Sequence, residues 1–109
     1  MSLSTEHCID GAAQLSEVEA EMLSTDLQDW IVTPAYLEKT FRFKNFYETM
    51  GFVNAVAWMA NQQDHHPDLD VSYSRCRVRW NTHTANNGIS RNDFICAARS
   101  DALTLKATS

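Results

Sequence analysis

The sequence is poor in the residues that build phosphate loops and disulfide frameworks. Its 109 residues include only 3 glycines and 2 prolines, and they form neither a glycine-rich phosphate loop nor a G-x-S-x-G nucleophile elbow. The 3 cysteines, Cys8, Cys76 and Cys96, follow no motif spacing, and an odd count does not suit a disulfide framework. We therefore expect no bound nucleotide. Cys76 and Cys96 fall in apolar patterns and are expected to be buried thiols.

Long apolar runs and an excess of positive charge are also missing. No apolar run approaches the roughly 20 residues that a membrane span needs. The first residues have neither a basic start nor the apolar core of a secretion signal. The formal net charge of −5 argues against direct binding to nucleic acid, which usually needs a basic face. These absences predict a cytoplasmic protein that binds neither membranes nor nucleic acid directly.

The composition and the periodicity of the sequence indicate one small domain. The apolar fraction of 44% and the charged fraction of 21% are ordinary for a globular protein. Residues 1–14 show no sustained periodicity, so we expect a flexible N-terminal lead followed by a single domain at 15–109. Ser16 with Glu19, and Asn45 with Glu48, have the spacing of helix-capping pairs. Each pair predicts the start of a helix.

Apolar periodicity predicts a regular order of elements. We expect a helix at about 16–28, strands at 30–32 and 36–43, a helix from 45 to about 64, strands at 69–73 and 76–83, and a last helix that opens at 90–93. Adjacent strands joined by short links pair antiparallel, and helices must cover the resulting sheet. The predicted fold is α+β. It is a two-layer domain with a four-stranded antiparallel sheet covered on one face by three helices, in the order α-β-β-α-β-β-α.

Two surfaces follow from this pattern. The helix after Asn45 is apolar over most of its circumference: one stripe holds Phe46, Met50, Val53, Ala57 and Ala60, and a second holds Phe52, Val56 and Met59. Such a helix is covered on more than one side, which favours a homo-oligomer. On the strand at 76–83, alternate arginines could bind an anion. We favour pairing with acidic residues across the sheet for this set, Arg75, Arg77 and Arg79.

Three of the four histidines cluster in the sequence. His65 and His66 precede Pro67, which disfavours the helical conformation at His66 and predicts that the helix ends near Asp64. His83 lies at the end of the strand at 76–83. Imidazoles titrate near neutral pH, so these three could form an acid–base site. Cationic side chains at a helix C-terminus are the plainer alternative for the His-His pair.

The other candidate roles are weaker. Three histidines and a carboxylate could bind zinc, but no HxH, HxxxH or CxxC spacing is present, and we expect no metal. Asp93 is the third helical residue after Ser90, a position typical of a helix cap. Beside His83 the same carboxylate could also orient an imidazole. The two roles are compatible.

Several of these segments resemble the pterin-4a-carbinolamine dehydratases. The resemblance spans about residues 16–101 and rests on Thr40–Phe46, Asp64-His65-His66-Pro67-Asp68, Tyr73, Thr82-His83 and Asn92-Asp93-Phe94. It implies a homodimer or homotetramer that converts 4a-hydroxytetrahydropterin to quinonoid dihydropterin and water. That step recycles tetrahydrobiopterin, and it needs no metal or organic cofactor.

The resemblance also implies roles for individual residues. His65, His66 and His83 would be the acid–base set, with Asp93 in support. The pterin pocket would be formed by Asn61, Asp64, Pro67, Thr82, Thr84 and Ala85. In two respects the chain departs from the family pattern. The family often has a glutamate at the place of Asn61, and the loop after His83 is one residue longer, around residues 86–87. These departures bear on activity and on the role of Asp93.

Two other functions compete with the dehydratase. Relatives of this fold act as dimerisation cofactors of a transcription factor or as assembly helpers for a carboxylating enzyme. The apolar helix and the open sheet face favour such a protein-interaction role. The presence of all three histidines favours the dehydratase, because a scaffold has no physical need for them. A small metal-dependent hydrolase is a third possibility and predicts a bound metal.

Overall fold

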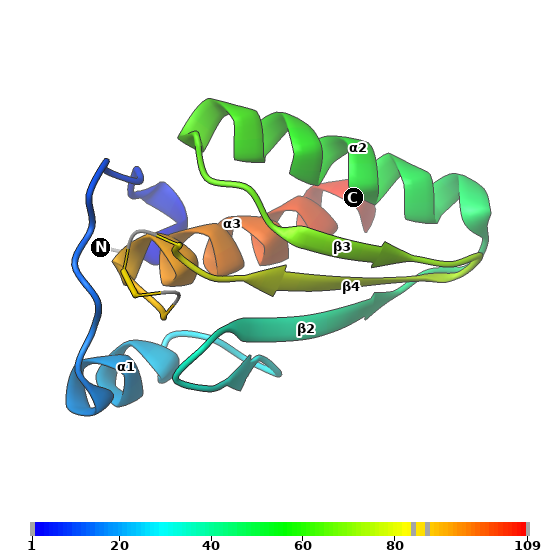
Figure 1. Cartoon of the computed structure of the whole chain (residues 1–109). Coiled ribbons are helices and arrows are strands. Elements are labelled where there is room, and N and C mark those ends of the chain that lie inside the picture. The colour runs from blue at the N-terminus through cyan, green and yellow to red at the C-terminus, as the bar shows by residue number, and fades with distance from the viewer. Residues whose placement is uncertain (1, 84, 87, 109) are drawn as a thin grey trace.

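The structure is a computed structural model that describes residues 2–83, 85–86 and 88–108, with side chains as far as Thr104. A 3-10 turn, η1 (Leu3–Thr5), precedes three helices and four strands (Figure 1). In chain order they are α1 (Glu17–Ser24), β1 (Ile31–Val32), β2 (Leu37–Arg42), α2 (Phe46–Gln63), β3 (Asp68–Val71), β4 (Arg75–Trp80) and α3 (Arg91–Thr108). This order confirms the predicted α+β fold.

The four strands form one antiparallel sheet in the order β1-β2-β4-β3. In the register of β2 and β4, Leu37 lies opposite Trp80, and Phe41 lies opposite Cys76. Side chains alternate across a strand, so these four residues share one face with Val78. All five are buried in the core that the sheet forms with the helices.

The opposite sheet face carries charge. Arg79 donates to Glu38 at 2.6 Å, and Arg77 pairs with Asp70 at 3.0 Å, which confirms the expected cross-strand pairing for these two arginines. Arg75 instead lies opposite Arg42 in the register of β4 and β2. The face is therefore mostly neutralised by its own strands.

The predicted helix caps are present. Ser16 and Glu19 form a reciprocal capping box at α1, and the Asn45 side chain accepts from the backbone N–H of Glu48 at α2. α1 is shorter than predicted and ends at Ser24. The hydroxyls of Ser24 and Thr25 donate back to carbonyl oxygens three residues earlier, which favours termination there. Among the described residues, no helix has the length and apolar character that crossing a bilayer requires.

One side of α2 packs into the core of this chain. The residues buried in the core are Phe52, Val56, Met59 and Ala60, whereas Phe46 and Ala57 are exposed. A helix that is apolar over most of its circumference gives periodicity little to choose between, so only packing against the sheet settles the face. Cys76 and Cys96 are buried free thiols, as predicted.

The N-terminal segment lies against α3. Leu3 is buried in the core, and Glu6 pairs with Arg91 while its carbonyl oxygen accepts from Arg99. The Cys8 Sγ lies 3.4 Å from the Cys96 Sγ. Mobility of residues 1–14 stays a prediction. In the structure, Glu6 and Ile9 of this segment bond to Arg91, Asn92 and Arg99 of α3, and Figure 1 shows the start of the chain beside this helix.

Candidate active site

A cavity of about 390 Å³ opens where the end of α2, the end of β4 and the start of α3 meet. Six of the predicted site residues line it together: Asp64, His65, His66, Pro67, Thr82 and His83. Asp93 lies beneath the cavity with no exposed surface. Asn61 and Ala85 are not part of the lining formed by the described residues, and Thr84 lies outside those residues.

The end of α2 sets the direction of the two adjacent histidines. Asp64 caps the helix in the left-handed conformation with φ of 50°, and the His65 N–H still donates to the Ala60 carbonyl oxygen at 3.1 Å. The helix therefore ends where predicted. The left-handed conformation of Asp64 ends the helix together with Pro67, the residue from which the end was predicted. The His65 side chain is only 12% exposed, whereas His66 is exposed.

Asp93 performs both of the roles that its position allowed. Its Oδ2 accepts from the Ser90 backbone N–H at 2.9 Å and from the Thr82 hydroxyl at 2.8 Å, so it caps α3. Its Oδ1 lies 2.6 Å from the His65 Nε2. From the sequence we expected it to orient an imidazole beside His83, and the structure shows it bonded to His65. One buried carboxylate thus fixes both a helix start and a histidine ring.

His65 is held on two sides. Its ring stacks on Trp80, with centroids 5.5 Å apart and planes 15° apart. Burial of the ring disfavours the proton, but the hydrogen bond and the charge of Asp93 outweigh that effect, so the pKa of His65 is raised above its ordinary value of 6.5. The arrangement favours a protonated and firmly oriented imidazole. Nothing in the sequence singled out Trp80 for this stacking.

The other two cavity histidines are held differently. The His66 Nε2 lies 2.9 Å from the Asn61 Oδ1, so the residue at the departure from the family pattern is the partner of a site histidine. His83 follows β4 in an exposed turn and lines the same cavity. Three histidines in different environments therefore line one cavity, and positioned imidazoles can donate and accept protons.

The cavity has an acidic rim. Asp10, Asp64 and Asp68 line it, and no lysine or arginine appears in the lining contributed by the described residues. A neutral ligand rich in hydrogen-bond donors suits this rim better than an anion. In the part of the chain that the structure describes, no group of three or more His, Cys, Asp or Glu residues has a metal-binding arrangement. That the chemistry needs no metal stays a prediction.

Sequence analysis missed one part of the lining. Ile9, Asp10 and Gly11 lie in the N-terminal lead and contribute to the cavity together with Asn92. The lead has no periodic pattern that would place it, and long-range hydrogen bonds to Gln63 of α2 and Asn92 of α3 hold it there. Asn92 belongs to the Asn-Asp-Phe motif of the resemblance, but a functional role was predicted only for its neighbour Asp93.

Comparisons with known proteins place the chain in a family. Residues 13–103 match the family described as pterin 4 alpha carbinolamine dehydratase. A Nitrosomonas eutropha protein provisionally named pterin-4-alpha-carbinolamine dehydratase is 52% identical over 97 residues, which cover 88% of this chain and 85% of the relative. A Legionella pneumophila protein with the same provisional name is 50% identical over 107 residues, covering 93% and 94% of the two chains.

Solved structures give the same result for the fold. A crystal structure of a transcriptional coactivator/pterin dehydratase from Brucella melitensis has a TM-score of 0.78 at 29% identity, covering 83% of this chain and 97% of that chain. A pterin dehydratase-like protein identified as a RuBisCO assembly factor in the alpha-carboxysome has a TM-score of 0.57 at 24% identity, covering 68% and 84%, and shows the fold alone. With the family match across most of its length, this chain belongs to the pterin 4 alpha carbinolamine dehydratase family.

Proposed function

We propose that this protein dehydrates 4a-hydroxytetrahydropterin to quinonoid dihydropterin and water by histidine acid–base catalysis. The observation that carries the proposal is the His65–Asp93 pair beneath a cavity that also presents His66 and His83. A structural scaffold would gain little from orienting an imidazole with a buried carboxylate at the bottom of an open cavity. Proton transfer does require that orientation.

The reaction needs two proton transfers. One proton goes to the 4a-hydroxyl, which leaves as water, and another leaves a ring nitrogen as the new C=N bond forms. We assign the donor role to His65, because Asp93 favours its protonated form and fixes the ring. His83 and His66 are the candidate acceptors, since both line the same cavity. Metal or organic cofactors have no step in this scheme.

The test is the dehydration rate of freshly generated 4a-hydroxytetrahydropterin in the presence of a chelator. We expect His65→Ala and His83→Ala each to lower kcat/KM by about 10²- to 10⁴-fold, the usual contribution of a positioned acid or base. His7→Ala is the matched control, because His7 is the one histidine that does not line the cavity. A well-folded wild type that gives no acceleration over buffer would contradict the proposal.

We also propose the setting of this activity. The reaction would serve tetrahydrobiopterin recycling in the cytoplasm, and the chain would act as a homodimer or homotetramer. The support for assembly is the exposed face of α2, where Tyr47 is 91% exposed and Trp58 is 65% exposed. Large aromatic residues at such exposure favour a protein contact. Sedimentation analysis of the wild type and of Trp58→Glu would test this, because a monomeric wild type contradicts the assembly.

The same aromatic face favours a second candidate function, a protein-interaction module. Phe46 on α2 stacks on Tyr73 with ring centroids 6.4 Å apart, and both side chains are exposed. Of the two structural neighbours, one is described as a transcriptional coactivator/pterin dehydratase and the other as a RuBisCO assembly factor. A chain that binds a protein partner through this face but keeps no catalytic rate after careful assay would favour the second function over the first.

A further inference from the structure

The N-terminal strap, defined here as Cys8–Gly11, is fixed against the body of the protein. The Cys8 N–H donates to the Gln63 Oε1 at 2.8 Å. The Asn92 side chain bonds both backbone groups of Ile9: its Oδ1 accepts from the N–H at 3.0 Å, and its Nδ2 donates to the carbonyl oxygen at 2.8 Å. Asn92 is 6% exposed, so this anchor is part of the buried structure.

The strap lies beside the catalytic cavity and faces the histidines. Ile9, Asp10 and Gly11 line the same cavity as His65, His66 and His83. Figure 1 shows the segment running past the end of the domain where α3 starts. The Ile9 side chain is 68% exposed even though its backbone is fully bonded to Asn92. A fixed backbone with an exposed branched apolar side chain at a cavity is suited to packing on an apolar ligand surface.

The strap lies outside the part of the chain that defines the family. The family match begins at residue 13, whereas the strap ends at residue 11. We propose that the strap is a substrate-binding wall, with Ile9 packing on the pterin and Asp10 completing the acidic rim. This inference rests on the proposed dehydratase function and adds a binding segment to it.

The contribution of Ile9 can be estimated from its exposed surface. Ligand burial of part of an isoleucine side chain stabilises the complex by an amount that corresponds to about three- to tenfold in affinity. The Ile9 side chain has no group that can donate or accept a proton, so its effect belongs in binding. Ile9→Ala should therefore raise KM by about three- to tenfold while kcat stays the same.

The experiment measures KM and kcat for 4a-hydroxytetrahydropterin with the wild type, Ile9→Ala, Ile9→Val and Ile31→Ala. Ile31 is the matched control, because it is 58% exposed and belongs to β1 rather than to the cavity lining. We expect Ile9→Val to retain most of the affinity and Ile31→Ala to match the wild type. As a second readout, the dissociation constant for an oxidised, unreactive pterin, measured by fluorescence quenching, should rise with Ile9→Ala in the same proportion as KM.

A second variant tests the strap independently, in case other residues of the cavity compensate for the shortened side chain in Ile9→Ala. Asn92→Ala removes both bonds to the Ile9 backbone, so it should raise KM at least as much as Ile9→Ala. An active wild type whose KM and pterin affinity are unchanged in both variants would overturn the strap assignment and leave the proposed function intact. A wild type that neither dehydrates nor binds pterin would overturn the proposed function and, with it, the assignment of the strap.

Discussion

Two helix starts in this chain use the same capping chemistry in opposite surroundings. At α2, Glu48 accepts from the Lys44 backbone N–H at 3.0 Å and donates its own N–H to Asn45, and its side chain is exposed. At α3, Asp93 accepts from the Ser90 N–H at 2.9 Å and is completely buried. Only the buried carboxylate has a second task, because only it has a histidine ring within bonding distance.

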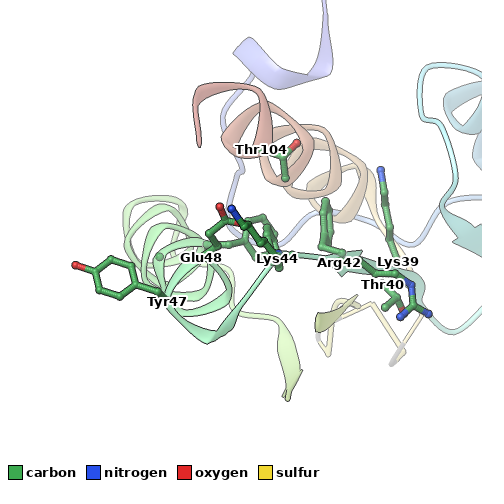
Figure 2. Close-up of a pocket in the computed structure, with 11 residues that line it drawn as sticks. Lys39, Thr40, Arg42, Lys44, Tyr47, Glu48 and Thr104 are labelled. Atoms are coloured by element: carbon green, nitrogen blue, oxygen red, sulfur yellow. The ribbon is translucent and has the colours of Figure 1, made fainter. Parts of the chain in front are cut away.

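The two hollows beside these helix starts also differ, in size and in the residues that line them. A groove of about 1030 Å³ lies along β2 and α2, with Lys39, Arg42 and Lys44 in its lining (Figure 2). It is larger than the histidine cavity of about 390 Å³, yet the described residues that line it include no histidine. Lys39 is already paired with Asp101 at 2.8 Å. The proposed chemistry therefore rests on the fixed, buried carboxylate beneath several imidazoles and not on the size of the hollow.

The largest expected effect comes from removing each carboxylate in turn. Asp93→Ala leaves the Ser90 N–H, the Thr82 hydroxyl and His65 without their acceptor, so we expect it to cost about 3 kcal/mol or more of unfolding free energy. The kcat/KM for dehydration should fall by about 10²-fold or more. Glu48→Ala should cost about 1 kcal/mol or less and leave the rate unchanged. Urea unfolding measures the free energy of unfolding, and the dehydration assay measures kcat/KM. Equal losses of stability and rate in the two variants would contradict the difference that we infer between the two carboxylates.

The two helix starts also show which features can be predicted from the sequence. Capping chemistry is local, so the starts of α1 and α2 and the capping role of Asp93 could be inferred from spacing. Which ring Asp93 would hold depends on how α2, β4 and α3 meet, and that is set by burial of Trp80 and its neighbours rather than by any local pattern. The buried face of α2 could not be chosen for a related reason, because several of its faces are apolar.

The strap shows the strongest limit on prediction from sequence. Residues 8–11 have no periodicity, and two distant amide side chains hold them: Gln63 accepts from the Cys8 N–H, and Asn92, more than 80 positions away, bonds to Ile9. Long-range side-chain bonds of this kind have no signature in local sequence. By contrast, His65, His66 and His83 could be predicted as a group, because a His-His-Pro at a helix end and a histidine at a strand end are both local features, and the three residues line one cavity.

A smaller effect tests the charge difference between the two hollows. The acidic rim of the histidine cavity should disfavour a pterin that carries a phosphate, whereas the groove beside α2 is basic. We expect the phosphate ester of an oxidised pterin to bind about tenfold more weakly than the free alcohol at low salt, with the gap narrowing as salt is added. Competition against the substrate measures both constants. Lys44→Ala, a groove variant, should leave the ratio unchanged, and a phosphate ester that binds more tightly would place the ligand elsewhere.

The smallest expected effect is a pH dependence carried by His65. Its pKa in the folded protein is raised above the ordinary 6.5 by Asp93, although burial opposes the shift. The folded state therefore holds this proton more tightly than the unfolded state does. The resulting stability is fully present below about pH 6.5 and is lost as the pH rises through the folded pKa. Asp93→Asn should flatten this decline, because an amide does not attract the proton.

The measurement is the free energy of unfolding in urea from about pH 5.5 to 8.5, a range chosen to span the ordinary and raised pKa values of histidine. Cys8 also faces His65. Its pKa is lowered, chiefly by the hydrogen bond with Cys96, and so its effect has the opposite sign. A Cys8→Ser background therefore isolates the histidine. His7→Gln is the control and should keep the full decline. If Asp93→Asn and the Cys8→Ser parent lose stability in parallel as the pH rises, then Asp93 does not hold the proton on His65, and the proposed acid must be reassigned among the cavity histidines.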